Sequence, residues 1–206
     1  MLESLYLFSL ATVALAISPG PDNIYVLTQS LTNGARSGIA TTAGLISGCI
    51  VHTTLLAFGV SIIITASPVI FFSIKVFGAC YLLFLAWRVY KSNESISIGN
   101  KATKKSHWQL FKQGVIMNLV NPKVLIFFLA FFPAFIWDET GNTVLQFYIL
   151  GIAFMVVSFM VFSGLALLAG SISTYMLTHK NTGFVLKWLQ IVVFVGIAVY
   201  ILLPDK

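Results

Sequence analysis

The sequence predicts an all-α integral membrane protein with six transmembrane helices, and three observations support this. Hydrophobic residues make up 58% of the 206 residues and charged residues only 9%, whereas about 25% of residues are charged in an ordinary soluble domain. A chain of this length has room for about six spans of roughly 20 residues with short loops, and for no large soluble domain. Two apolar segments, one in each half of the chain, are interrupted by proline, which predicts two broken helices.

Six apolar segments follow one another along the chain, and we expect one span from each: residues 5–31, 39–64, 68–90, 115–137, 144–168 and 184–203. As a straight helix the first would be roughly 40 Å long, more than a bilayer core, so a break or a strong tilt must absorb the excess. In the second, Ala40, Gly44 and Gly48 recur every four residues, a spacing that favours close helix packing.

The two interrupted segments share a pattern, in which proline is followed directly by an ionisable residue. The first break reads Pro19-Gly20-Pro21-Asp22-Asn23, and the second reads Asn121-Pro122-Lys123. In lipid, non-helical backbone is tolerated only where it is buried in protein or lines a cavity, and a charge there usually serves function. Broken helices in two halves therefore predict a transport site near the membrane midplane.

The chain is expected to form a single transporter domain over residues 1–206, built from two halves. Residues 1–90 and 107–206 each contain three spans, and the polar stretch 91–106 is interpreted as a cytoplasmic loop between them. Because three is odd, the two halves must insert with opposite orientation. A break falls in the first span of each half, so we predict two inverted three-helix repeats, broken at Pro19–Pro21 and at Asn121-Pro122.

Basic residues gather on one side of the predicted membrane, which we assign to the cytoplasm. Nine of the twelve Lys and Arg residues fall on that side: Arg36, Arg88, Lys91, Lys101, Lys104, Lys105, Lys112, Lys180 and Lys187. Both termini are then expected outside. The net charge of +6 is read as a topology signal in a lipid bilayer, and no nucleic-acid partner is expected.

Four stretches together resemble one family: SPGPDNIYVL, NGARSGIATTAGLISGCIVHTTLLAFGVS, IKVFGACYLLFLAWRVY and GVIMNLVNPKVLIFFLAFFPAF. They resemble the lysine exporter (LysE/RhtB) family of amino-acid efflux proteins, in the family's order and over nearly the whole chain. One departure is Ala134, where the family pattern has glutamine between proline and phenylalanine. The resemblance implies export of amino acids or related metabolites across the bacterial inner (plasma) membrane, driven by the membrane potential or a proton gradient.

Asp22 and Lys123 are the candidate centre of a substrate site, because each follows the break proline of its half. An amino acid needs an anion for its ammonium group and a cation for its carboxylate, and broken helix ends supply further donors and acceptors. A structural ion pair between the halves is the alternative. The remaining candidates shape or line the site: Pro19, Gly20, Pro21, Pro122, Asn23, Asn121, His52 and Lys75.

Several of these candidates have a second interpretation. Asn23 and Asn121 can instead cap the broken helices. His52 is either a proton relay or a buried, hydrogen-bonded histidine. Lys75 is either a ligand or an anchor whose long stem reaches the membrane interface. Asp22 is the only acidic residue within a predicted span, which favours neutral amino acids over lysine or arginine.

Two other functions are weighed against export of amino acids. A transmembrane thiol–disulfide electron carrier would use Cys49 and Cys80, but such chemistry needs two facing reactive cysteines. A metal-ion exporter would need more ligands than Cys49, His52 and Asp22 provide. Enzymatic activity, a metal and a cofactor are not expected. The sequence leaves the oligomeric state open, with a homodimer as one option.

Overall fold

The computed structural model describes residues 1–17, 20–61, 68–91, 104–138, 141–172 and 182–203. Most residues in these ranges are helical, and no strand occurs within them. In chain order the elements are α1 (Leu2–Ile17), α2 (Pro21–Asn33), α3 (Ala35–Leu55), η1 (Leu56–Val60), α5 (Pro68–Lys91), α6 (His107–Val120), α7 (Pro122–Phe131), η2 (Phe132–Phe135), α8 (Thr143–Leu167) and α10 (Thr182–Leu202).

Both predicted breaks are present as sharp bends. The helices α1 and α2 meet at 61°, and α6 meets the segment Val124–Phe135 at 58°. Gly20 precedes α2 in an extended conformation and Pro21 occupies its first turn, where the missing proline N–H would have no partner anyway. Pro19 lies outside the described residues.

The second broken helix begins earlier than predicted. We expected its span to start near residue 115, but α6 is regular from His107. Ser106 explains the difference, because it forms a capping box with Gln109: each side chain bonds the other's backbone N–H. Such reciprocal bonds satisfy two donors at the helix start.

Several described helices are long and apolar enough to cross a membrane. Ala35–Val60 and Thr143–Leu167 qualify as straight spans, and each bent pair also qualifies if it is taken as one span. In α10, the segment Lys187–Leu202 is a shorter apolar helix. The lower end of the span containing α3 is a π-helical turn, Leu56–Val60. The fold is therefore that of an all-helical integral membrane protein.

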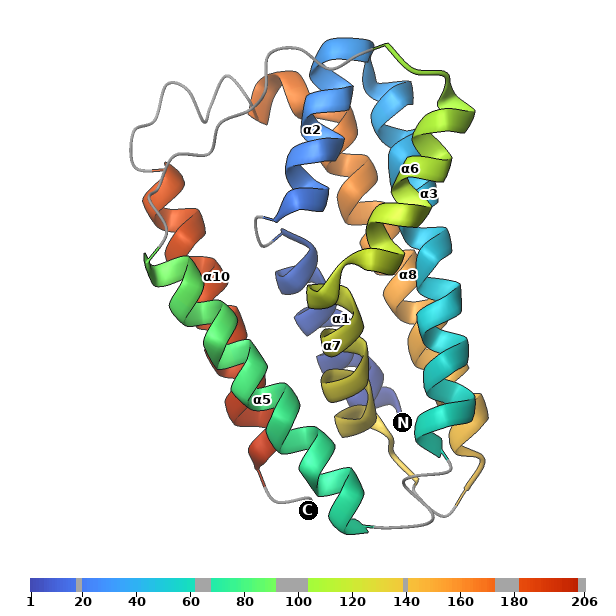
Figure 1. Cartoon of the computed structure of the whole chain (residues 1–206), viewed down its shortest axis with the longest axis vertical. Helices are drawn as coiled ribbons and strands as arrows, with labels where there is room; N and C mark the ends of the chain where they lie inside the picture. Colours follow the sequence, from blue (N-terminus) through green and yellow to red (C-terminus); the bar gives the residue numbers. More distant parts are fainter. Residues whose placement is uncertain (18–19, 62–67, 92–103, 139–140, 173–181, 204–206) are drawn as a thin grey trace.

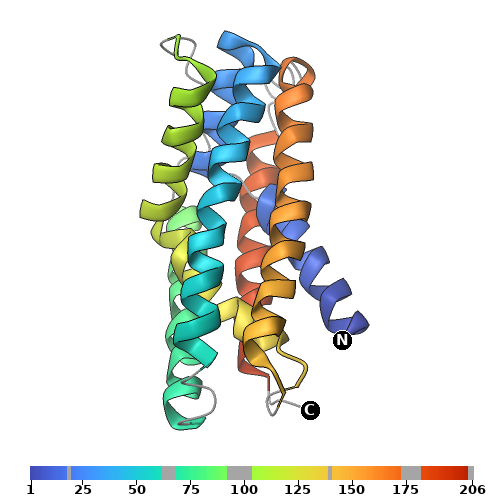
Figure 2. The same ribbon diagram turned by 90° about the vertical axis from the view of Figure 1, so that its right-hand side faces the viewer.

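Helices from the first half of the chain pack against helices from the second half (Figure 1, Figure 2). The helix α3 packs against α2, α6 and α8, while α5 packs against α10 and α1 against α8. Within the pairs α3–α8 and α5–α10 the two helices run in opposite directions (Figure 1, Figure 2). Met1 and the last turn of α10 lie at the same end of the molecule (Figure 1).

The predicted small-residue stripe of α3 does bring helices into close contact. A Cβ atom added at Gly44 would meet the backbone of Phe111, and one added at Gly114 would meet the backbone around Thr41 and Leu45. The backbones of α3 and α6 therefore touch at these two glycines. One turn along α3, a Cβ at Gly48 would meet the side chain of Asn118.

Phenylalanine rings form the core beside the second break. Phe128 stacks on Phe132 with ring centroids 4.1 Å apart, and Phe127 stacks on Phe131 at 4.4 Å. Phe8 of α1 reaches Phe132 at 5.0 Å. All five side chains are at most 1% exposed. The cluster fixes the short helix α7 against α1, so the lower arm of the second broken helix has a fixed place.

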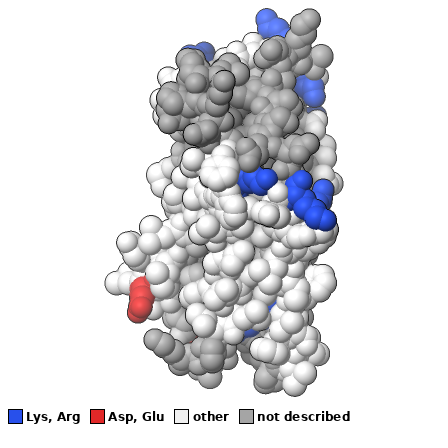
Figure 3. Space-filling view, turned by 90° about the vertical axis from the view of Figure 1, so that its left-hand side faces the viewer, with Lys and Arg blue, Asp and Glu red and all other residues white. Residues whose placement is uncertain are grey.

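The outer faces are apolar, as a lipid-facing surface requires. Large hydrophobic side chains are exposed on separate helices, including Leu10 (50%), Phe77 (66%), Val156 (52%) and Val192 (63%). Lys and Arg side chains gather in the upper part and at mid-height of the face in Figure 3, whose lower half is largely uncharged. This separation agrees with a membrane protein that has one basic side.

Candidate functional site

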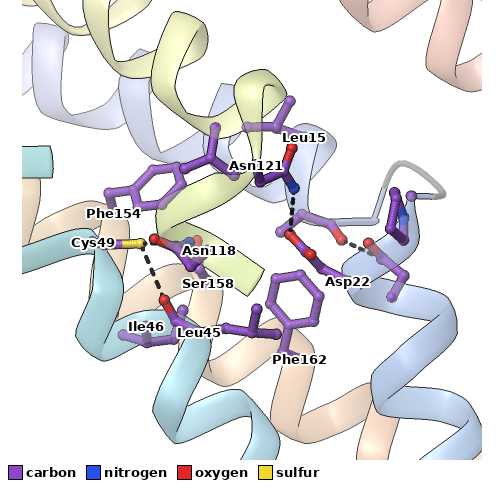
Figure 4. A pocket seen from close by; sticks show the side chains of 15 residues that line it. Leu15, Asp22, Leu45, Ile46, Cys49, Asn118, Asn121, Phe154, Ser158 and Phe162 are labelled. Carbon is purple, nitrogen blue, oxygen red and sulfur yellow. Dashed lines mark hydrogen bonds between the residues drawn. The ribbon is translucent and has the colours of Figure 1, made fainter. Parts of the chain in front are cut away.

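A small cavity lies where the two helix breaks meet (Figure 4). Its volume is about 60 Å³, and both breaks contribute to its wall together with α3 and α8. Its apolar lining comes from Leu15, Ala16, Leu45, Ile46, Val124, Phe154 and Phe162. A space of this size holds only a few water molecules, and ligand pockets are usually about 300–1,000 Å³. The cavity must widen to hold an amino acid.

A hydrogen bond between Asn121 and Asp22 joins the two breaks across this cavity. The Asn121 amide Nδ2 donates to Asp22 Oδ2 at 3.1 Å, although 99 positions separate these residues in the chain. Asp22 belongs to the first turn of α2, where the helix dipole stabilises a negative charge. This bond brings the first turn of α2 into contact with Asn121 at the second break.

The predicted partner Lys123 begins α7 together with Pro122. Its side chain lies outside the described part of the structure. The proposed charged centre of Asp22 and Lys123 therefore stays a prediction, as does the alternative of a structural ion pair.

Asn23 and Asn121 both act on the broken backbone. The Asn23 Nδ2 donates to the Ala16 carbonyl at 2.7 Å, so this side chain satisfies an acceptor at the end of α1. The Asn121 N–H donates to the Asn118 carbonyl at 3.2 Å, and the Asn121 carbonyl accepts from the Val124 N–H at 3.1 Å. The side chain of Asn23 therefore caps the first break, whereas at the second break the backbone of Asn121 makes these bonds and its side chain bonds Asp22. Both asparagines also line the cavity.

Asn118 and Ser158 are polar residues of the wall that the sequence analysis did not select. Asn118 is 4% exposed and its Nδ2 lies 3.5 Å from Cys49 Sγ. Its Oδ1 has no hydrogen-bond partner among the described residues, and neither has the Oγ of Ser158, which is 2% exposed. A buried polar atom without a partner costs about 1–3 kcal/mol. Both atoms can receive a hydrogen bond from a ligand.

A sequence signal existed for one of these two residues. Asn118 precedes Asn121 by one helical turn, so both asparagines lie on the same face of the helix end. Ser158 gave no comparable signal, because a lone serine in an apolar span is equally suited to helix packing.

His52 and Lys75 stand apart from the cavity wall. His52 Nε2 lies 3.3 Å from the Asn118 carbonyl oxygen, and its ring lies 5.4 Å from Phe128. His52 therefore reaches the site through its contact with Asn118. Lys75 is 6% exposed within α5, which does not suit an anchor extended to the membrane interface. Neither residue lines the cavity between the breaks.

The cysteines do not form a facing pair. Both thiols are free, with Cys49 buried beside Asn118 and Cys80 exposed on α5. A thiol–disulfide carrier is therefore not supported. Among the described residues, no group of three or more His, Cys, Asp and Glu side chains could hold a metal ion.

Comparison with known proteins agrees with the resemblance found in the motifs. Residues 13–204 match the LysE type translocator family. Two relatives, from Salmonella typhimurium strain LT2 and from Salmonella typhi, are each named homoserine/homoserine lactone efflux protein. Each is 32% identical over 176 residues, which covers 85% of this chain and 85% of the relative. No solved structure matches the chain. The chain therefore belongs to the LysE type translocator family of membrane transport proteins.

Proposed function

We propose that this protein is a secondary transporter that exports small neutral amino acids or related metabolites, including homoserine and its lactone, from the bacterial cytoplasm. The observation that carries the proposal is the Asn121–Asp22 hydrogen bond, which joins two helix breaks around a cavity. Irregular backbone at a helix break is costly in lipid unless it lines a functional cavity. The names of the two Salmonella relatives support the substrate class.

The substrate's ammonium group binds Asp22 in this proposal. It replaces the Asn121 amide as the hydrogen-bond donor to that carboxylate. A substrate hydroxyl then bonds Asn118 Oδ1 or Ser158 Oγ, which have no described partner. The substrate's carboxylate binds the first turn of α7 and Lys123, since a helix N-terminus attracts anions. All these residues belong to one chain, so the proposal requires no second subunit.

Alternating access follows from six spans in two inverted repeats. The packing supports this arrangement, because α6 packs on α3 while α1 and α2 pack on α8, and because α3–α8 and α5–α10 are antiparallel pairs (Figure 1). In the proposed orientation the basic side is cytoplasmic and both termini lie outside. The protein then resides in the inner membrane.

The membrane potential or a proton gradient drives export in this proposal. Asp22 is the candidate proton carrier, because it is the carboxylate in the cavity wall. A proton and the substrate ammonium group then compete for one site as access alternates.

Export from cells tests the proposed function. Cells with and without the gene are loaded with a panel of amino acids as dipeptides, and with homoserine and its lactone directly. We expect faster efflux of small neutral substrates from cells that carry the gene, and no acceleration from cells that carry Asp22→Asn at matched membrane abundance. Equal efflux of every panel member from both strains would contradict the proposal.

A further inference from the structure

A second, larger cavity lies on the other side of the helix breaks. Its volume is about 410 Å³, which falls in the usual range of about 300–1,000 Å³ for ligand pockets. Gly20, Pro21 and Asn121 line both this cavity and the smaller one between the breaks. These three residues therefore form a wall shared by two spaces, of which only the larger can hold an amino acid as described.

The far wall of the larger cavity comes from α5 and α10, which stand as a pair beside the two breaks (Figure 1). Leu85, Val89 and Phe194 make most of it apolar. Polar groups come from Tyr81 and Gln190, and a positive charge comes from Arg88 in the last turn of α5. An apolar pocket with a few converging polar groups is the usual form of a small-molecule site.

Arg88 is suited to a carboxylate ligand. Its side chain is exposed, and it makes no hydrogen bond or ion pair with another described residue. A guanidinium group offers two parallel N–H donors whose spacing matches the two oxygens of a carboxylate. The cavity is thus large enough for an amino acid, and Arg88 supplies the positive charge that the carboxylate of an amino acid requires.

We propose that this cavity is a loading site, in which Arg88 binds the carboxylate of a small amino acid before the substrate passes the shared wall. The proposal rests on the proposed function for the direction and class of transport, and it adds a binding site that the break cavity does not contain. The Asn121 side chain then moves out of the shared wall, because the substrate ammonium group replaces it as the hydrogen-bond donor to Asp22.

Lys91 provides a matched control for Arg88. Both are cations of the last turn of α5, and both were counted as basic-side charges from the sequence. The ammonium group of Lys91 lies 4.4 Å from the centre of the Trp87 ring, and Lys91 does not line the cavity. If Arg88 only marks the membrane interface, the two residues should behave alike.

Equilibrium binding to the purified full-length protein tests this proposal. The probes are L-homoserine and L-homoserine lactone, because the lactone keeps the ammonium group but has no carboxylate. We expect Arg88→Gln to raise the Kd of homoserine about tenfold or more and to leave the Kd of the lactone unchanged. Lys91→Gln should change neither value, and Arg88→Lys should recover part of the homoserine affinity because it keeps the charge.

The outcomes separate the loading site from the proposed function. Unchanged homoserine binding by Arg88→Gln, in a protein that still exports, would overturn the loading site alone. Equal weakening of both probes, varying with anionic-lipid content, would assign Arg88 to a lipid phosphate and also overturn it. A wild-type protein that neither binds nor exports either probe would contradict both proposals. The Asp22→Asn variant should keep the Arg88 dependence of homoserine binding, because the two residues line different cavities.

Discussion

Two glycines one turn apart on α3 give the sharpest test of the packing around the site. An added Cβ at Gly44 would lie 3.0 Å or less from three backbone atoms of Phe111, and one at Gly48 would lie under 3.0 Å from three side-chain atoms of Asn118. Replacing a helical glycine by alanine gains about 0.5–1 kcal/mol from backbone entropy. Pressing a methyl group into packed atoms costs about 1–3 kcal/mol.

The balance differs between the two positions. Backbone cannot move aside without separating α3 from α6, so Gly44→Ala should lose about 2 kcal/mol of unfolding free energy or more. At Gly48 the Asn118 amide can rotate aside, but the Asn118 Cβ, 2.8 Å from the added atom, is fixed to the backbone of α6, so Gly48→Ala should cost about 1–2 kcal/mol, less than Gly44→Ala. That rotation breaks the contact of Asn118 Nδ2 with Cys49 Sγ and redirects Oδ1. Gly48→Ala should therefore fold but export poorly.

Denaturant unfolding in detergent and homoserine export, measured on both variants, check these values. Wild-type stability of Gly44→Ala would refute the described contact between α3 and α6. Wild-type export by Gly48→Ala would refute the assignment of Asn118 to the site.

Three further predictions concern the charges, the break and the orientation. Asp22→Asn and Lys123→Met should each stop export, and the double variant should recover membrane abundance without export; recovered export would show that the two residues are only a structural ion pair. Replacing Gly20 and Pro21 together by alanine favours a continuous helix, and should abolish export from a protein that still inserts; normal efflux would show that the break has no function. Reporter fusions at the C-terminus should read as periplasmic and fusions within residues 93–103 as cytoplasmic, and the reverse pattern would contradict the assigned orientation.

The sequence predicted those parts of the fold that are governed by local backbone chemistry. Proline at 21 and 122 predicted both bends, because proline removes a backbone donor wherever it stands. The four-residue spacing of Gly44 and Gly48 predicted a close helix contact, which the structure places against α6. The six-span inverted repeat and the orientation remain predictions.

Features that depend on which helices meet could not be predicted. Nothing in the sequence shows that the Asn121 amide would donate to Asp22, or that Arg88 would line a cavity. The packing of Phe8 on the rings of α7 and η2 likewise requires the tertiary arrangement. The earlier start of α6 had a local signal in the Ser106–Gln109 capping box, but the apolar pattern that we used to set its bounds begins later.

Export by reconstituted protein tests the central claim, that substrate passes through the cavity at Asp22, most directly. Vesicles containing wild type, Asp22→Asn or Glu3→Gln are loaded with radiolabelled homoserine, and its release is followed under an imposed proton gradient and membrane potential. Glu3 is the control, because it is an exposed carboxylate in the first turn of α1 and lies outside the cavity. The account predicts release of homoserine from wild-type and Glu3→Gln vesicles. From Asp22→Asn vesicles it predicts release no faster than from loaded vesicles without protein. Release by Asp22→Asn at the wild-type rate would contradict it.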